Sequence, residues 1–381
     1  MGIKLRDSNA ESEVTLDIIE YLDDGNSKYF KISNREGKEI VIQYVPTSDS
    51  NWELSRYEVI LFENPYLKAE NDVFEIRHSN LKGERLGWIF PITILESNDN
   101  DFINHKNLNN YKFIAYKYLL NKGGSKILQQ TPDNIYKLTD LYFDSTILCV
   151  LCKNTISKIN NFSISDYILS FHRYGYSLFF DWPKARAIFD KSDFIKTIRN
   201  TRSSIKLSKP SIDIKENTFI KYLFEEHLIQ IDNCVLRFIF LYQILEYLME
   251  KEFDLLIKNQ IEDFNKKRIS KNDLRENLIS DSRERDLIKS VIEKSQIDNS
   301  LKLEFEQECS FLFSNINFTS KKNSFGDQLY NFRNIITHRL RDVTTKPNDE
   351  SVTKISEIFE RIIIDILMNY SYSEIPPLVQ A

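Results

Sequence analysis

Hydrophobic and polar residues alternate over short segments in the first part of the chain. The segments are rich in Ile, Val, Tyr and Phe, and turn residues such as Asp24-Gly25-Asn26 and Glu36-Gly37 separate them. They span residues 14–18, 29–32, 39–44, 73–76 and 88–92. Alternation of this kind is typical of strands with one buried face. We therefore expect a β-rich module at the amino-terminal end.

The middle of the chain has a mixed pattern. Residues 111–120 have helical spacing, whereas residues 147–151 fit a helix and a strand equally well. A proline in the first turn of 183–198 favours a helix there. The following segment, 200–216, is polar, contains Pro210 and lacks periodicity. We interpret it as a linker between two domains.

Beyond the linker, apolar residues recur every three to four positions, which predicts helices that bury one face. Segment 218–258 fits two helices, or one bent helix, with a break near Asp232-Asn233. Further helices are expected at residues 271–280, 283–294, 300–313, 326–340 and 351–370. The pattern as a whole predicts an α+β protein, with a β-rich mixed α/β domain at residues 1–200 and an all-α domain at residues 215–381.

Composition narrows the classes of function. A length of 381 residues fits two domains, or one large domain with an elaboration, and 41% hydrophobic residues can fill their cores. The net charge of −5 excludes a basic protein that coats nucleic acid, so any such contact is local. The longest apolar run, 238–245, is too short to cross a bilayer, and residues 1–7 do not resemble a signal segment. We expect a cytoplasmic protein with no membrane partner, and the abundance of Asn, Ile and Lys is typical of AT-rich bacterial genomes.

Neither of two possible metal motifs is convincing. Cys149 and Cys152 have the spacing of a zinc knuckle or a redox pair, but their neighbours are apolar and no second pair of ligands follows. Glu225-Glu226-His227 lacks a second His four residues later and lies in an amphipathic segment. We therefore expect neither a metal ion nor another cofactor.

One short motif carries candidate chemistry. Arg333-Asn334 is followed by His338 inside the helix predicted at 326–340. A His moves protons near neutral pH, and an Arg grips a phosphate with two parallel hydrogen bonds. This pair suits cleavage of a phosphodiester without a metal ion. A plain structural alternative is a helix whose His lies near the carboxyl end, where a cation interacts favourably with the helix dipole.

Helix geometry separates the three side chains of the motif. Residues four apart differ by about 40° around a helix, whereas residues five apart differ by about 140°. Asn334 and His338 therefore share a face, and Arg333 lies to one side. Either the Arg333 side chain wraps back, or the helix is distorted, or the partner of Arg333 comes from a second copy of the chain. The geometry favours a composite site in a two-fold homodimer.

RNA is the substrate that this chemistry fits best, because its 2′-hydroxyl is an internal nucleophile. His338 would remove the proton of that hydroxyl or protonate the leaving 5′-oxygen. Arg333 would stabilise the charge on the phosphorane oxygens, and Asn334 would orient the imidazole or hold a phosphate oxygen. The expected products are a 2′,3′-cyclic phosphate and a 5′-hydroxyl.

The motif, on a late helix of an all-α domain that opens with a long helix containing Tyr-Gln-Ile-Leu-Glu-Tyr, resembles the HEPN superfamily. More narrowly, the segment 215–370 resembles the HEPN domains of bacterial anti-phage abortive-infection proteins of the ApeA-like kind. The resemblance implies a HEPN-like helical bundle, a homodimer, metal-independent endoribonuclease activity and growth arrest of the infected cell. RNA, with tRNA as one candidate, is the implied substrate.

The resemblance assigns the family's Arg, polar residue and His to Arg333, Asn334 and His338. The resemblance matches Glu246 to an acidic residue on an earlier helix that lines the same cleft, and the alternative is a solvated or salt-bridged position. Arg339 and Arg341 follow the motif and are candidates for binding phosphates, or they cap the helix.

Two other functions fit the same residues. The helical domain could bind a nucleotide, RNA or a protein without cutting. Alternatively, the chain could be a toxin that its own amino-terminal domain restrains. In the abortive-infection reading, the amino-terminal domain senses a trigger derived from the phage.

Overall fold

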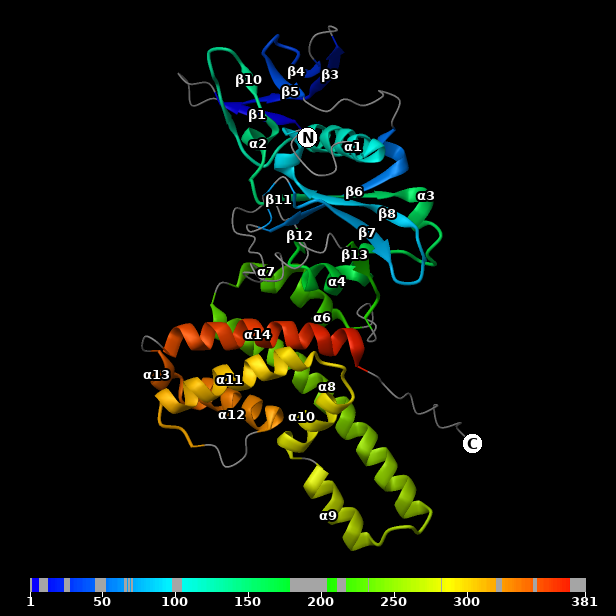
Figure 1. Cartoon of the computed structure of the whole chain (residues 1–381), viewed down its shortest axis with the longest axis vertical. Coiled ribbons are helices and arrows are strands. Elements are labelled where there is room, and N and C mark those ends of the chain that lie inside the picture. The colour runs from blue at the N-terminus through cyan, green and yellow to red at the C-terminus, as the bar shows by residue number, and fades with distance from the viewer. Residues whose placement is uncertain are drawn as a thin grey trace. The chain divides into compact units, whose positions relative to one another are not determined.

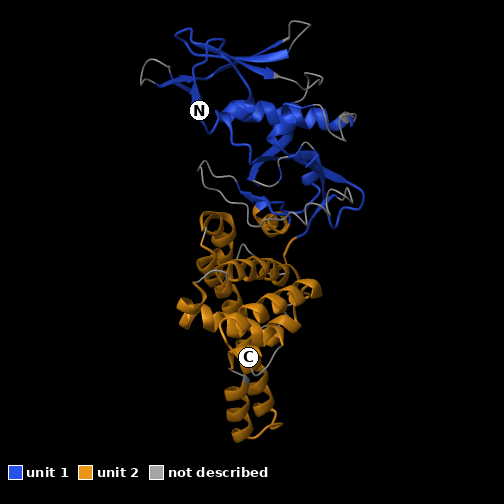
Figure 2. Ribbon diagram, turned by 60° about the vertical axis from the view of Figure 1, so that its left-hand side comes forward, with its two compact units in different colours: residues 1–164, 174–208 blue, residues 165–173, 209–381 orange. Residues whose placement is uncertain are grey.

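The chain divides into two compact units (Figures 1 and 2). The computed structural model describes residues 2–6, 13–23, 28–44, 53–64, 67, 69, 71–97, 105–178, 204–210, 217–231, 233–281, 283–319, 324–344 and 348–370. Unit 1 comprises Met1–Ile164 and Tyr174–Ser208, and unit 2 comprises Ser165–Arg173 and Lys209–Ala381. Unit 1 contains the sheets and unit 2 is helical. The predicted α+β class, with a β-rich part followed by a helical part, is confirmed.

The largest sheet of the described residues in unit 1 has six strands. These are β6 (Tyr57–Glu63), β7 (Phe74–His78), β8 (Arg85–Pro91), β11 (Thr146–Cys152), β12 (Ser177–Leu178) and β13 (Ile205–Leu207). They lie in the order β12-β6-β11-β8-β7-β13, with β13 parallel to β7 and the other neighbours antiparallel. Residues 205–207, predicted as part of the linker, therefore form an edge strand, because Ile205 and Leu207 are buried beside β7.

Two smaller sheets complete the β structure described in unit 1. One has the order β10 (Ile135–Tyr136), β5 (Glu39–Tyr44), β4 (Lys28–Ser33) and β3 (Ile18–Asp23). The other has the order β2 (Glu13–Leu16), β1 (Ile3–Arg6) and β9 (Leu128–Gln129). Each of the predicted strand segments overlaps an observed strand, and β5 has the predicted bounds.

Helix α1 (Lys106–Lys122) packs against β6, β8 and β11 and supplies much of the core of unit 1 (Figure 1). Leu148 and Val150 of β11 belong to this core. Cys149 lies between them, fully buried, and its burial raises the pKa of its thiol. Cys149 and Cys152 are both free, on a strand rather than in a metal knuckle. The ambiguous segment 147–151 is thus a strand that pairs with β6 and β8.

Short helical segments connect these elements. They are α2 (Leu138–Leu141), α3 (Lys153–Ile156) and the 3₁₀ turns Leu54–Arg56, Ile92–Leu95 and Ile164–Tyr167. The helix predicted at 183–198 lies outside the described residues, as do parts of the expected linker.

The helical elements described in unit 2 are α4 (Ile168–Arg173), α6 (Thr218–Tyr222), a π-helical turn (Leu223–His227), α7 (Leu228–Gln230), α8 (Cys234–Asn265), α9 (Lys271–Asp281), α10 (Glu284–Glu293), α11 (Asn299–Asn315), α12 (Phe325–His338), α13 (Leu340–Val343) and α14 (Asn348–Asn369). Each segment that the apolar spacing predicts as helix in unit 2 overlaps an observed helix, whereas the short helices α4 and α13 were not predicted. The predicted break near 232–233 is observed, because the Asn233 side chain accepts a hydrogen bond from the Leu236 amide and caps α8.

Helices α8, α11, α12 and α14 form the core of unit 2. The ring of Phe238 on α8 lies 4.8 Å from the rings of both Phe332 on α12 and Phe359 on α14. Beyond this core, α9 packs along the second half of α8, and the two helices extend from the bundle as a hairpin (Figures 1 and 2). No helix in the described part of the chain combines the length and apolar character that crossing a bilayer requires.

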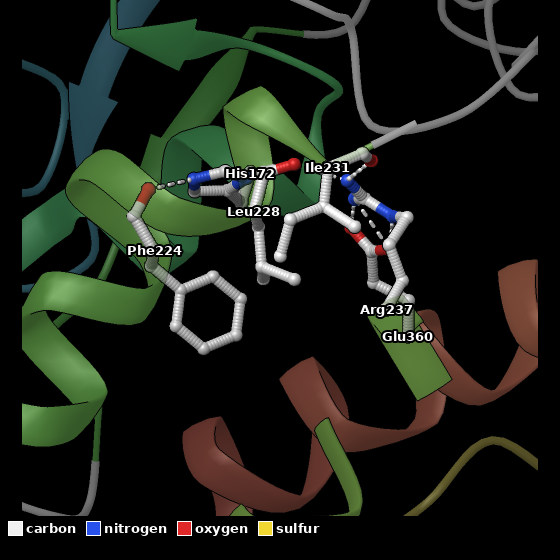
Figure 3. Close-up of polar contacts among 6 residues, drawn as sticks. All are labelled: His172, Phe224, Leu228, Ile231, Arg237 and Glu360. Carbon is white, nitrogen blue, oxygen red and sulfur yellow. Dashed lines mark hydrogen bonds and ion pairs between the residues drawn. The ribbon is translucent and has the colours of Figure 1, made fainter. Parts of the chain in front are cut away.

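Polar contacts explain why Ser165–Arg173 falls in unit 2, although the sequence analysis placed it in the amino-terminal domain. His172 Nε2 donates to the Phe224 carbonyl at 2.8 Å (Figure 3). Arg173 pairs with the buried Asp365 of α14, at 3.6 Å between Nη2 and Oδ1. These contacts tie α4 to the helical bundle.

Candidate functional site

The motif lies on α12, whose start is fixed by Ser324. The Ser324 hydroxyl accepts a hydrogen bond from the Asp327 amide and donates one to Asp327 Oδ2 at 2.5 Å. This arrangement is a common helix start. Phe332, Ile335 and Ile336 are buried on the inner face of the helix. The polar residues of the motif are consequently left on the outer face.

Arg333 lies among acidic and aromatic side chains from two other helices. Its Nη2 is 3.8 Å from Glu246 Oε1 on α8, and its Nε is 3.7 Å from Glu284 Oε1 on α10. Its Nη1 donates to Asn334 Oδ1 at 3.1 Å, and its guanidinium lies 5.7 Å from the centre of the Tyr242 ring. The Arg333 side chain therefore reaches its neighbour within one chain, which is the first of the three arrangements that helix geometry allowed.

Tyr242 and Glu284 are joined by a hydrogen bond beneath Arg333. The Tyr242 hydroxyl donates to Glu284 Oε1 at 2.7 Å. Burial, followed by the neighbouring Glu284 carboxylate, raises the pKa of the Tyr242 phenol far above its ordinary value. The phenol thus stays protonated and remains a donor to Glu284 at physiological pH.

His338 is the last residue of α12 and is exposed. Among the described residues, none forms a hydrogen bond or ion pair with it. Thr337, just before it, turns its hydroxyl back to donate to the Arg333 carbonyl at 2.9 Å. Asn334 is partly exposed and holds Arg333. A single chain thus brings Arg333 and Asn334 together and leaves the His338 imidazole open to solvent.

The two arginines after the motif differ in their surroundings. Arg339 Nε donates to Asp342 Oδ2 at 2.8 Å, and its guanidinium lies 5.6 Å from the centre of the Phe318 ring. The side chain of Arg341 is 94% exposed, with its Nε 3.6 Å from Asp342 Oδ1. Arg339 is therefore held in place by the protein, whereas Arg341 projects into solvent beyond the end of α12.

Glu246, predicted from the sequence as a candidate residue of the same site, lies beside Arg333. Tyr242 and Glu284 were not singled out. Tyr242 precedes Glu246 by four residues on α8, and this spacing puts both on one face, so it was a usable signal. Glu284 offered no such signal, because its contact with Arg333 depends on how α10 packs beside α12.

Arg285, next to Glu284, holds the other side of α12. Its Nη2 donates to Asn331 Oδ1 at 3.3 Å, and its guanidinium lies 4.5 Å from the centre of the Tyr330 ring. The first turn of α10 therefore contacts α12 through two consecutive charged residues. These contacts hold α12 in one orientation about its own axis relative to α10.

The site combines a cation that can grip a phosphate with an exposed imidazole that can transfer protons. The described residues contain no group of three or more His, Cys, Asp or Glu side chains placed to hold a metal ion. Comparisons of the chain with protein-family models, curated proteins and solved structures give no match. The HEPN resemblance accordingly rests on the residues of the motif and on their helical setting.

Proposed function

We propose that the chain is a HEPN-type endoribonuclease that cleaves RNA without a metal ion. One observation carries this proposal. Arg333 donates a hydrogen bond to Asn334 on the outer face of α12, and the exposed His338 follows Asn334 by four residues on the same helix. These are the three residue types of the family motif, on one helix of an all-helical unit. The site is supported by Glu246 from a second helix.

Each side chain has a distinct role in the proposed reaction. His338 takes the proton of the ribose 2′-hydroxyl or gives one to the leaving 5′-oxygen. Arg333 binds the scissile phosphate and stabilises the charge of the phosphorane, and Asn334 holds the guanidinium in place. The step forms a bond between the 2′-oxygen and phosphorus and breaks the bond between phosphorus and the 5′-oxygen. It leaves a 2′,3′-cyclic phosphate and a 5′-hydroxyl.

A homodimer would complete this site. A monomer offers one Arg333 and one His338, and cleavage by acid and base together is served better by two imidazoles. Exposure of His338 leaves it accessible to a second chain, and Arg341 is equally accessible for binding the RNA backbone. In a two-fold dimer, α12 of each chain would contribute to one shared groove.

The biological setting that we propose is abortive infection in a bacterial cytoplasm. RNA, with tRNA as one candidate, is the substrate, and digestion of cellular RNA stops growth. Unit 1 would then sense a phage-derived trigger or restrain the toxicity of unit 2.

A binding module that does not cut is the second candidate function. It is favoured by one observation, the position of Arg333 between the carboxylates of Glu246 and Glu284. These carboxylates compete with a phosphate for the guanidinium. A nucleotide or protein ligand with its own cationic group would instead find acidic partners there.

Expression in bacteria separates the two candidates. The wild-type chain is expressed both in uninfected cells and in cells infected with phage. In at least one of these conditions we expect it to slow growth and to generate new 5′-hydroxyl RNA ends. The His338→Ala chain should do neither while reaching the same level of folded protein. New ends produced equally by both chains would reject the proposed function, and their sequence context in the wild-type sample would identify the RNA target.

A further inference from the structure

The three nitrogens of Arg333 face three different acceptors. Nε faces Glu284, Nη1 donates to Asn334, and Nη2 faces Glu246. An Arg binds a phosphate through a pair of nitrogens. Only some of these contacts can therefore persist when a phosphate is bound.

Glu284 is the more firmly held of the two carboxylates. Its side chain is 30% exposed, against 48% for Glu246. Glu284 accepts a hydrogen bond from the buried Tyr242 hydroxyl, and it is the first residue of α10, where backbone N–H groups favour a negative charge. For Glu246, in contrast, Arg333 is the partner within the described residues.

Because Glu284 is held more firmly than Glu246, the Nε side of the guanidinium has a fixed partner and the Nη2 side has an exchangeable one. The Nε edge rests against Glu284 and over the ring of Tyr242. The two terminal nitrogens point toward Asn334 and the half-exposed Glu246. The terminal pair can exchange the Glu246 carboxylate for two phosphate oxygens without moving the Nε edge.

We propose that Tyr242 and Glu284 are positioning residues, which fix the Nε edge of Arg333 so that its terminal nitrogens grip the scissile phosphate. This inference rests on the proposed function. The chain of contacts runs from the Tyr242 hydroxyl to Glu284 Oε1 and from there to Arg333 Nε. Removing its first or second member releases the guanidinium while leaving Arg333 in the sequence.

Tyr242→Phe tests the first link without changing charge or the buried ring. Tyr247→Phe is the matched control. It also removes a tyrosine hydroxyl from α8, but the Tyr247 hydroxyl forms no hydrogen bond with another described residue. We expect Tyr242→Phe to lower kcat for RNA about 10-fold and to change KM less than about 2-fold, since positioning acts on the transition state. Tyr247→Phe should keep the wild-type kcat.

A second readout does not depend on RNA cleavage. Phenylglyoxal modifies accessible arginines, and peptide mass spectrometry of the full-length chain reports its rate at Arg333. Tyr242→Phe and Glu284→Gln should each raise this rate at least about 3-fold over wild type, because the Nε edge loses its restraint. Circular dichroism and the Tm of each variant show whether it is folded, and the rate at the exposed Arg341 serves as the internal reference.

The two readouts distinguish failure of this inference from failure of the proposed function. Faster modification of Arg333 in both variants supports the restraint even if the wild-type chain cuts no RNA, a result that would reject the ribonuclease alone. If the wild-type chain cuts RNA and Tyr242→Phe keeps its kcat, the positioning role is overturned. Unchanged modification of Arg333 in both folded variants overturns it as well.

Discussion

Arg237 of α8 and Glu360 of α14 form a buried two-pronged ion pair (Figure 3). Arg237 Nη2 lies 2.7 Å from both oxygens of the Glu360 carboxylate, and Nε donates to Oε2 at 3.0 Å. The remaining nitrogen, Nη1, donates to the carbonyls of Leu228 and Ile231, at 3.1 Å for Ile231. The pair fastens the helix that carries Tyr242 to the last helix of the bundle.

Breaking this pair should destabilise unit 2. Glu360→Gln keeps the side-chain volume but leaves the Arg237 charge buried without a counter-charge, so we expect a loss of about 3–5 kcal/mol in the free energy of unfolding. The half-exposed pair of Glu304 on α11 with Arg361 on α14, at 3.5 Å between Oε2 and Nη1, provides the control. Glu304→Gln should cost at most about 1 kcal/mol. Denaturant unfolding measures both, and equal losses would contradict this role of the buried pair.

A second buried carboxylate, Glu252 on α8, should make stability depend on pH. Burial raises the pKa of Glu252, but hydrogen bonds from Lys294, Tyr370 and Ser290 outweigh burial, so the pKa lies below its ordinary value. A depressed pKa contributes stability above the unfolded-state pKa, and that contribution is lost as the pH falls through the folded-state pKa.

The prediction for Glu252→Gln follows from that sign. The variant should be less stable than wild type at neutral pH, and the gap in free energy of unfolding should narrow below about pH 4.3, the ordinary value for a Glu carboxyl. Glu250→Gln, an exposed change two residues away, corrects for general effects of charge. A gap between wild type and Glu252→Gln that widens as the solution becomes more acidic would show that the sign is wrong.

The sequence predicted those elements whose side-chain pattern reflects their own burial. Ile40 and Ile42 of β5 are fully buried on one face, and the short run of β-branched residues that contains them, between Glu39 and Gln43, indicated that strand. Ile205–Leu207 was missed, because three residues carry little pattern and their strand character depends on pairing with β7, far away in the sequence. Likewise, the motif helix was recognisable from its apolar face.

The immediate surroundings of Arg333 were less predictable. The angle between Arg333 and His338 around the helix axis followed from helix geometry, but the direction of the long Arg333 side chain did not. That direction depends on Glu246 of α8 and Glu284 of α10, which meet Arg333 only when the three helices pack. A contact between helices leaves no periodic trace in a single sequence.

The charge of Arg333 should not suffice for cleavage. A Lys at this position keeps the charge but cannot hold Glu284 through one edge and a phosphate through another, so we expect Arg333→Lys to lower kcat/KM for RNA about 100-fold. Arg341→Lys is the matched control, because the Arg341 side chain is exposed and its Nε lies 3.6 Å from Asp342 Oδ1, too far for a strong hydrogen bond. It should lower kcat/KM less than about 3-fold. Near wild-type activity in Arg333→Lys would mean that Arg333 acts as a simple point charge.

A shared groove that needs two imidazoles should lose most of its activity when only one of the two chains lacks His338. Wild-type and His338→Ala chains, coexpressed with different tags and purified through both, form a mixed dimer whose groove keeps one imidazole. We expect this mixed dimer to have less than about 10% of the wild-type activity, because one His does not serve as acid and base together. About half of the wild-type activity would show that each chain cleaves RNA independently.

The most direct measurement is the yield of 2′,3′-cyclic phosphate ends when purified full-length chain is incubated with tRNA or total RNA in excess chelator, for wild type and for His338→Ala. The account predicts that wild type produces these ends in chelator and that the folded His338→Ala chain lowers the rate at least about 100-fold. Cleavage that stops when divalent ions are removed, or that persists in His338→Ala, would contradict it.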